Sequence, residues 1–421
     1  MRMLLGMLVA WLGWSTAHAA DVYLESRRLG FEKIPVVVLP FSGSAGQEQA
    51  RLVETILQAD LARSHLFEIV DLQKTFPPDT PPGRVASLSG ALVAVSALLS
   101  ADGEKRVLSG FAHEAAQAEP AVGVKLSGDA QSIRQIAHRF ADKLVSHFTG
   151  EPGVAQTKIA YVSDQTGKKE VYMMDYDGAN ETRLTGDRSI VVSPRWSHDA
   201  EALTYTSYRS GNPDVYLLNM NTAQRKVLIA YPGINLSPSW LPSGEQMVFS
   251  STKTGDAEIY TMRPDGGGLK RLTFSDANDL SPSWAPSGRQ IAFTSDRGGS
   301  PQIYVMDADG SNVRRLTFSG VYNTSPAWSP KGDRVAYACR NDEKRLKICL
   351  IDAAGQGMAQ ITDNGSYDDE SPSWAPSGQD IVFASNRMGK GQIFSIHADG
   401  TSLIRLTASD ANHTAPAWSP R

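Results

Sequence analysis

Ser281-Pro282-Ser283-Trp284 is one of six copies of a Ser-Pro-x-Trp motif, the last of which has alanine in place of serine. The motif tryptophans are spaced 44, 44, 44, 46 and 44 residues apart, at Trp196, Trp240, Trp284, Trp328, Trp374 and Trp418. A unit of this length cannot bury its own apolar face, so consecutive units must stack on one another. The sequence therefore predicts a repeat architecture from about residue 158 onward.

Each unit contains four short strands, here called A to D. In the unit that starts at Ser281 they are predicted at Ser281–Trp284, Ile291–Ser295, Ile303–Met306 and Arg314–Thr317. The connections carry the residues that tight turns require, such as Asp309-Gly310 between strands C and D. Four strands in 44 residues are typical of a β-propeller blade. The alternation of apolar and small residues within the strands excludes a helical repeat.

The two ends of the repeat region complement each other. The first unit, which starts near Lys158, has strands B, C and D but no motif before them. The last motif, Ala415–Trp418, supplies only a strand A. The C-terminal strand is therefore expected to complete the first blade, which closes a ring of six blades and leaves no free sheet edge.

Strand A is predicted to be the innermost strand of each blade. Proline is tolerated inside a strand where its missing N–H would face open space, as on the wall of a central channel. The motif tryptophan then packs between blades. Asp175–Gly178 and Asp307–Gly310 resemble the start of a calcium-binding loop but lack its remaining acidic ligands. They are interpreted as turns, and neither a metal site nor a cofactor is predicted.

The first 150 residues lack the repeat. Residues 1–20 have the cationic start, the apolar stretch and the Ala17-His18-Ala19 pattern of a cleaved signal peptide, so export is expected. Residues 21–150 are predicted to form a small α/β domain, residues 151–157 a linker and residues 158–421 the propeller. The elements expected in the first domain are strands at Ile34–Phe41, Phe67–Val70, Ala91–Leu99, Arg106–His113 and Val122–Leu126, helices at Gln47–Arg63 and Ala130–Phe148, and a loop at Pro77–Gly83.

Composition narrows the classes of partner. The chain has 41 Lys and Arg against 45 Asp and Glu, which argues against a protein that binds nucleic acid or anionic lipid. After the signal peptide no run of about 18 apolar residues follows, so direct membrane insertion is not expected. Cys339 and Cys349 lie in one repeat unit. A disulfide and two reduced core residues remain alternatives, because strand register decides between them.

The whole mature chain resembles the TolB family of the Tol–Pal envelope system. The resemblance is carried by the repeated Ser-Pro-x-Trp, Ile-Ala-Phe, Ile-Tyr-x-Met-Asp, Asp-Gly and Arg-Leu-Thr segments, by Ile34–Phe41, by the junction from Phe148 to Val162, and by the C-terminal Ala415–Pro420. It implies an α+β N-terminal domain followed by an all-β six-bladed propeller closed by its C-terminal strand.

The resemblance also implies partners. In this family the propeller binds the lipoprotein Pal, and the N-terminal domain with the mature N-terminal segment binds the inner-membrane protein TolA. For this chain it implies a periplasmic, non-enzymatic protein that supports outer-membrane invagination at division and envelope integrity, with other outer-membrane proteins as further partners. The segment expected to contact TolA is Val22, Tyr23, Leu24 and Glu25.

Topology indicates which face of the propeller is available to Pal. Antiparallel strands place the D–A and B–C loops on one face, here called the D–A face, and the A–B and C–D loops on the other, the A–B face. The chain enters and leaves the ring on the A–B face, so the first domain is expected near it and the D–A face is expected to be free. The residues predicted to contact Pal are polar loop residues of that free face: Asn235, Asn278, Asp279, Arg297, Tyr322, Asn323, Asp369, Glu370, Arg387, Asn412 and His413.

Two enzymatic readings compete with a binding module. The first is a metal-dependent hydrolase or lactonase whose channel mouth assembles Asp279, Asp369, Glu370 and His413. No recurring acid and histidine constellation supports it, and fold alone does not imply activity. The second is the propeller gate of a peptidase, which requires a hydrolase domain with a Gly-x-Ser-x-Gly motif. That motif is absent.

Overall fold

The computed structural model describes residues 33–421, which divide into one compact unit up to Gly153 and a second from Val154 to Arg421. The boundary lies inside the segment predicted as the linker. The predicted signal peptide and the predicted TolA-contacting residues Val22–Glu25 lie outside the described residues. No helix among the described residues is long and apolar enough to span a membrane.

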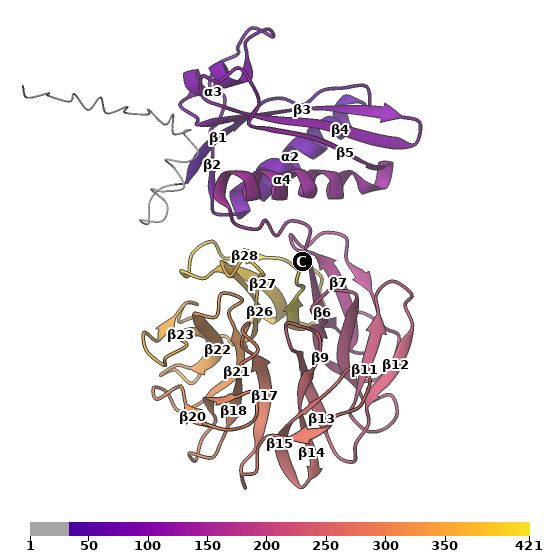
Figure 1. Cartoon of the computed structure of the whole chain (residues 1–421), viewed down its shortest axis with the longest axis vertical. Helices are drawn as coiled ribbons and strands as arrows, with labels where there is room; N and C mark the ends of the chain where they lie inside the picture. The colour runs from indigo at the N-terminus through magenta and orange to yellow at the C-terminus, as the bar shows by residue number, and fades with distance from the viewer. Residues whose placement is uncertain (1–32) are drawn as a thin grey trace, which may run out of the picture. The chain divides into compact units, whose positions relative to one another are not determined.

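The first unit is a five-stranded sheet with the order β2-β1-β3-β4-β5. Its strands are β1 Ile34–Val38, β2 Phe67–Ile69, β3 Val93–Asp102, β4 Lys105–Glu114 and β5 Val122–Asp129. Strand β1 runs parallel to β2 and β3, whereas β3, β4 and β5 are antiparallel. Helices α2 (Gln47–Arg63) and α4 (Ile133–Thr149) contact each other and pack against this sheet (Figure 1). The predicted α/β architecture is therefore present.

Two local differences from the predicted elements have clear causes. Helix α3 (Pro82–Ser89) begins inside the segment Pro77–Gly83 that the sequence predicts to be a loop. Proline at the first helical position loses no hydrogen bond, and Gly90 ends the helix with φ of 78°. The last helix was expected from Ala130, but a 3₁₀ turn, η1 (Ala130–Ser132), precedes it. The Asp129 carboxylate caps that turn by accepting from the backbone N–H groups of Gln131 and Ser132.

The second unit consists of six four-stranded antiparallel sheets, which follow one another around a ring (Figure 1). Blade 1 contains β29 His413–Trp418, β6 Lys158–Ser163, β7 Glu170–Asp175 and β8 Thr182–Arg183, and blade 2 contains β9 Val191–Trp196, β10 Ala202–Ser207, β11 Asp214–Asn219 and β12 Arg225–Ile229. Blade 3 contains β13 Asn235–Trp240, β14 Met247–Thr254, β15 Asp256–Met262 and β16 Lys270–Arg271, and blade 4 contains β17 Asp279–Trp284, β18 Gln290–Ser295, β19 Gln302–Asp307 and β20 Arg314–Arg315. Blade 5 contains β21 Asn323–Trp328, β22 Arg334–Arg340, β23 Leu346–Asp352 and β24 Ala359–Gln360, and blade 6 contains β25 Asp369–Trp374, β26 Asp380–Met388, β27 Lys390–His397 and β28 Ile404–Arg405.

The C-terminal strand closes the ring as predicted. Strand β29 pairs with β6, with His413 opposite Ser163 and Trp418 opposite Ile159. The backbone N–H of Lys158 also donates to Oγ of Ser419 at 2.9 Å. The propeller therefore has no unpaired inner strand at the point where its two ends meet.

The motif tryptophans pack between blades. Trp196 of blade 2 lies in one apolar cluster with Ala160, Val162 and Val171 of blade 1. Its indole Nε1 donates to the backbone oxygen of Ala417 at 3.0 Å, and Trp374 makes the same bond to Ala327. Each of these side chains therefore ties its own inner strand to the inner strand of the preceding blade.

A bulge interrupts the inner strand of every blade. The first residue of each motif has a left-handed backbone with φ between 50° and 56°, at Ser193, Ser237, Ser281, Ser325, Ser371 and Ala415. Such a conformation costs a residue other than glycine roughly 1–2 kcal/mol. The pairing between strands A and B shifts register at this point. The bulge therefore explains how proline is accommodated at the next position without a lost ladder hydrogen bond.

A disulfide joins Cys339 of β22 to Cys349 of β23, with a Cα–Cα distance of 5.8 Å. The two strands are neighbours in blade 5, and Cys349 lies opposite Tyr337 whereas Cys339 lies opposite Lys347. The cysteines are thus diagonal partners on one face of the sheet. This register decides between the two alternatives that the sequence left open.

Candidate partner-binding face of the propeller

The D–A face is built from the residues at which each strand A begins. The five predicted contact residues that occupy this position are all buried: Asn235, Asp279, Asn323, Asp369 and His413. Each lies opposite the last residues of its own strand B, as Asp279 lies opposite Ser295. The prediction that these side chains contact a partner directly is therefore corrected, because they are enclosed by their own blades.

The buried residues of this ring make internal hydrogen bonds. Asn235 donates from Nδ2 to the backbone oxygen of Tyr231 at 2.8 Å and accepts from Ser251 Oγ at 2.8 Å. The imidazole Nε2 of His413 lies 2.7 Å from Ser409 Oγ. Their polarity thus serves to hold the D–A loops in place.

The two aspartates of this ring are neutralised by arginines of their own blades, Arg297 in the B–C loop of blade 4 and Arg387 near the end of β26. Nη2 of Arg297 lies 2.8 Å from the carboxylate of Asp279, and Nη2 of Arg387 lies 3.0 Å from that of Asp369. The Arg387 guanidinium also lies 4.5 Å from the ring centroid of Tyr367. Removing Asp279 would leave the partly buried Arg297 without its counter-ion, and removing Asp369 would leave Arg387 with only the more distant Asp363 at 3.8 Å, so these pairs organise the loops.

A second ring of buried polar residues was not predicted from the sequence. The residue that starts or precedes the apolar part of strand C is buried in every blade, as Glu170, Asp214, Glu258, Gln302, Lys347 and Gln392. Gln302 is representative, since its Oε1 accepts from Thr317 Oγ1 and Asn323 Nδ2, both at 2.8 Å. The sequence signal for this ring is a polar residue directly before the Ile or Val of each strand C, which is followed by tyrosine in four blades, by cysteine in blade 5 and by phenylalanine in blade 6.

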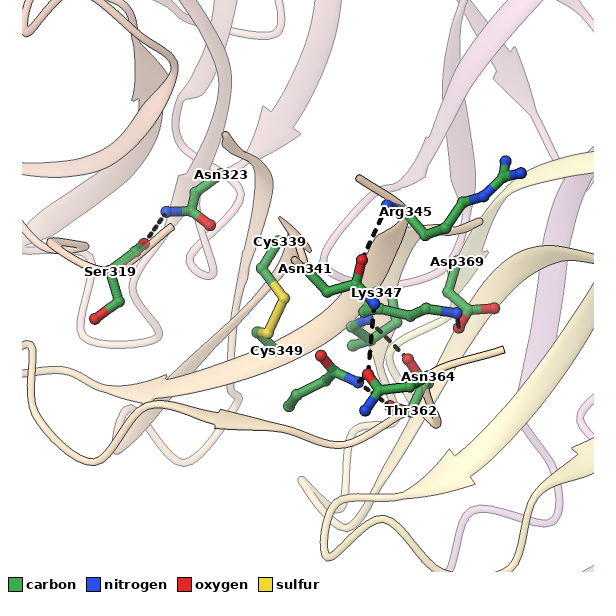
Figure 2. Close-up of a disulfide and its surroundings, with 12 residues drawn as sticks. Ser319, Asn323, Cys339, Asn341, Arg345, Lys347, Cys349, Thr362, Asn364 and Asp369 are labelled. Carbon is green, nitrogen blue, oxygen red and sulfur yellow. Dashed lines mark hydrogen bonds and ion pairs between the residues drawn. A yellow bond between two sulfur atoms is a disulfide. The ribbon is translucent and has the colours of Figure 1, made fainter. Parts of the chain in front are cut away.

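Lys347 makes blade 5 different from the others. Its ammonium is fully buried and donates to the backbone oxygens of Gly365 at 2.7 Å and Tyr367 at 2.9 Å. The nitrogen lies 3.9 Å from the carboxylate of Asp369, close to the disulfide (Figure 2). Burial lowers the pKa of Lys347, and the charge of Asp369 opposes that shift. A buried cation here replaces the neutral glutamine of blades 4 and 6.

The remaining predicted contact residues are at least partly exposed to solvent. Asn278, Arg297, Glu370 and Asn412 are exposed, whereas Tyr322 and Arg387 are half-buried. Asn278 and Asn412 also shape the loops: each donates from its backbone and its side chain to an aspartate of the adjacent B–C loop, Asp296 and Asp164 respectively. Partial desolvation of its carboxyl group raises the pKa of Glu370 although part of the residue is exposed, and the charges of Asp368 and Asp369 add to this effect.

Apolar side chains on the same face were also missed. Phe274 and Phe318 follow the Arg-Leu-Thr segment of blades 3 and 4, and their side chains are 76% and 74% exposed. Each ring is covered on one side by an arginine, since the guanidinium carbon of Arg271 lies 4.7 Å and that of Arg315 5.1 Å from the centroid. Val321, in the loop that follows Phe318, is 69% exposed. Exposed aromatic and arginine side chains in one region are typical of a protein-binding surface.

The structure does not bring together the four residues of the alternative hydrolase site. Among residues 33–421, Asp279, Asp369, Glu370 and His413 form no group of three ligand atoms within 4.8 Å of one another. The two aspartates are already engaged by arginines. The contacts of Asp279 and Asp369 are therefore those of residues that organise the loops of their own blades.

Comparison with known proteins identifies the family. A family model described as the TolB β-propeller domain matches residues 145–421. The chain belongs to the TolB family. The Tol–Pal system protein TolB of Syntrophotalea carbinolica is 34% identical over 208 residues, which cover 47% of this chain and 48% of the relative. That of Geobacter sulfurreducens is 36% identical over 212 residues, covering 48% of each. The chain therefore spans about half the length of the curated relatives it matches.

Structural comparison extends this family likeness to the first unit. The crystal structure of TolB from Acinetobacter baumannii covers 93% of this chain and 98% of its own, at a TM-score of 0.80 and 26% identity. A putative TolB from Agrobacterium tumefaciens covers 60% of this chain at a TM-score of 0.50 and 21% identity, and shows the shared fold alone. An N-terminal α/β unit followed by a six-bladed propeller is thus the architecture of this TolB family member.

Proposed function

We propose that this chain is a periplasmic, non-enzymatic protein-binding component of a Tol–Pal system. The D–A face of its propeller binds the lipoprotein Pal, and its N-terminal unit together with the segment from Val22 to Glu25 binds TolA. These contacts support outer-membrane invagination at division and envelope integrity. The names of its relatives, Tol–Pal system protein TolB, support this assignment.

The observation that carries the Pal-binding part is the exposed aromatic pair on the D–A face. Phe274 and Phe318 occupy equivalent positions in adjacent blades and bury little of their surface in the free chain. Arg297 and Tyr322 lie in loops of the same face and supply polar contacts. An apolar anchor with a polar surround is the arrangement from which stable interfaces are built.

The connection between the two units supports the same choice of face. The chain enters the propeller at Lys158 and ends after Trp418, and both residues lie at the A–B ends of their strands. The D–A loops are therefore at the opposite ends of the strands from both chain termini of the propeller.

The experiment measures Pal binding by isothermal titration with the mature protein. Because Asp279 and Asp369 are buried and Arg297 is paired with Asp279, the informative substitutions are Phe274→Ala, Phe318→Ala and Val321→Ala. We expect each to weaken binding about tenfold or more, equal to about 1.4 kcal/mol. Val313→Ala and Arg289→Glu are the matched controls, because both residues are exposed in turns of the A–B face. Equal affinity of the Phe274→Ala, Phe318→Ala double variant and the unmodified protein would reject this face.

A further inference from the structure

The six inner strands enclose a cavity of about 420 Å³ along the propeller axis. It is lined by the motif residues from the bulge serine to the A–B turn, including Ser193, Ser237, Ser281, Pro330 and Pro376. The first residues of strand A, which form the D–A face, do not line it. The cavity is therefore separate from the proposed Pal-binding surface.

The charge of the cavity wall is unbalanced. Its charged or titratable lining residues are Arg195 and His198, and the lining contains neither aspartate nor glutamate. Arg195 occupies the variable position of its motif, where the other five blades have serine or alanine. The guanidinium donates from Nη1 to the backbone oxygen of Pro194 at 2.8 Å, and within residues 33–421 it has no carboxylate partner.

An arginine in this environment needs a counter-ion. Burial lowers the pKa of Arg195 to about 10, and no neighbouring acid offsets the effect. Arg195 is half-buried, and a guanidinium with one N–H group bonded to the protein loses part of its hydration without recovering it from the protein. A planar oxyanion would restore these hydrogen bonds through two parallel N–H donors.

The hydroxyl groups of the wall offer further donors. No protein partner is found, among the described residues, for the side chains of the bulge serines Ser193, Ser237, Ser281, Ser325 and Ser371. Ser283 and Ser373 accept from the backbone N–H groups of Trp328 and Trp418. Their hydroxyl hydrogens remain available to a ligand in the cavity. The wall thus combines one fixed positive charge with several neutral donors.

We propose that the central cavity of this propeller binds a small oxyanion, a carboxylate or a phosphate, through the Arg195 guanidinium and the surrounding serine hydroxyls. The same charge repels cations, so a divalent metal ion does not occupy the cavity next to Arg195. The site is independent of the proposed partner face and needs no partner protein.

Titration calorimetry of the mature full chain with inorganic phosphate, and separately with succinate, tests the proposal at constant ionic strength. Binding of either probe supports the proposal, and the probe that binds with higher affinity identifies the class of anion. Arg195→Ser introduces the residue found at this position in blades 3, 4 and 6, and we expect it to weaken binding at least about tenfold, or about 1.4 kcal/mol. Arg289→Ser, an exposed arginine in an A–B turn, is the control and should bind as the unmodified protein does.

A second measurement does not depend on the variant folding. In crystals grown with selenate, the anomalous peak is expected within hydrogen-bond distance of the Arg195 guanidinium. Absence of binding by both probes, equal binding by Arg195→Ser, or calcium binding in the cavity of the unmodified protein would each overturn the proposal.

Discussion

Trp418 donates its indole Nε1 hydrogen to Oγ1 of Thr157 at 2.8 Å, so that residues 261 positions apart in the chain hold the propeller closed. Thr157 in turn donates to the backbone oxygen of Val154. Thr157, which lies just before strand β6, therefore binds the side chain of the last residue of strand β29. We call the Trp418–Thr157 hydrogen bond and the pairing of β29 with β6 the latch. It makes the stability of the propeller depend on the final residues of the sequence.

Truncation of this latch should open the ring. Deleting residues 414–421 removes most of β29 and leaves the edge of β6 unpaired, so we expect a lower melting temperature and concentration-dependent aggregation. Trp418→Ala should destabilise the protein by about 3–5 kcal/mol, because a large buried side chain is lost. Thermal unfolding and light scattering measure both effects. Deletion of the exposed Arg421 alone is the control, and a similar loss in that variant would contradict the latch.

The disulfide of blade 5 should contribute measurably to stability. The closed loop between Cys339 and Cys349 is short, with a sequence separation of 10. In the loop-entropy model its removal costs about 2–3 kcal/mol. We expect the Cys339→Ser, Cys349→Ser variant to show this decrease in urea unfolding. A reducing agent should destabilise the unmodified protein by the same amount and leave the variant unchanged; a reducing-agent effect on the variant would contradict the assignment.

The buried Lys347 and Asp369 should behave as a coupled pair. Lys347→Met removes two hydrogen bonds and leaves Asp369 with Arg387 alone, so we expect a loss of about 3–5 kcal/mol. The double variant Lys347→Gln, Asp369→Asn reproduces the Gln302 and Asn323 arrangement found one blade earlier.

The double variant should therefore lose less stability than the sum of the losses measured for the single variants Lys347→Gln and Asp369→Asn. Urea unfolding of all four proteins gives the coupling free energy. Strict additivity would show that the two residues act separately.

His413 should make stability depend on pH. Burial lowers its pKa, against the raising effects of Glu181 and Asp164 and together with the lowering effect of Arg405. Below about pH 6.5 the unfolded chain binds a proton at this residue that the folded chain resists, so its contribution to stability is lost as the pH falls. The comparison is urea unfolding at pH 7.5 and 5.5.

His413→Asn isolates this effect, because asparagine occupies the same position in blades 3 and 5. We expect the variant to lose less stability between the two pH values than the unmodified protein. An identical pH dependence would assign the titration to other groups.

The sequence alone determined the closed ring of six blades. A motif repeated about every 44 residues, with strand A missing at one end and alone at the other, has one arrangement that leaves no sheet edge unpaired. It also determined the packing role of the tryptophans, because proline two residues earlier confines that strand to the inner wall. Helix α3 was not predicted because proline-rich segments occur both in loops and at the first turn of helices.

Only the tertiary structure decided which polar residues are available to a partner. Asp279 and Asn278 are neighbours in the chain and equally polar, yet Asp279 is buried against Arg297 and Asn278 is exposed. Arg195 is a second example. Comparison of the six motifs shows that arginine is unusual at this position, but only the closed propeller shows that it lines a cavity whose wall contains no acidic side chain. Burial depends on how loops and adjacent blades pack around each residue, and this information is not contained in the sequence of any single repeat.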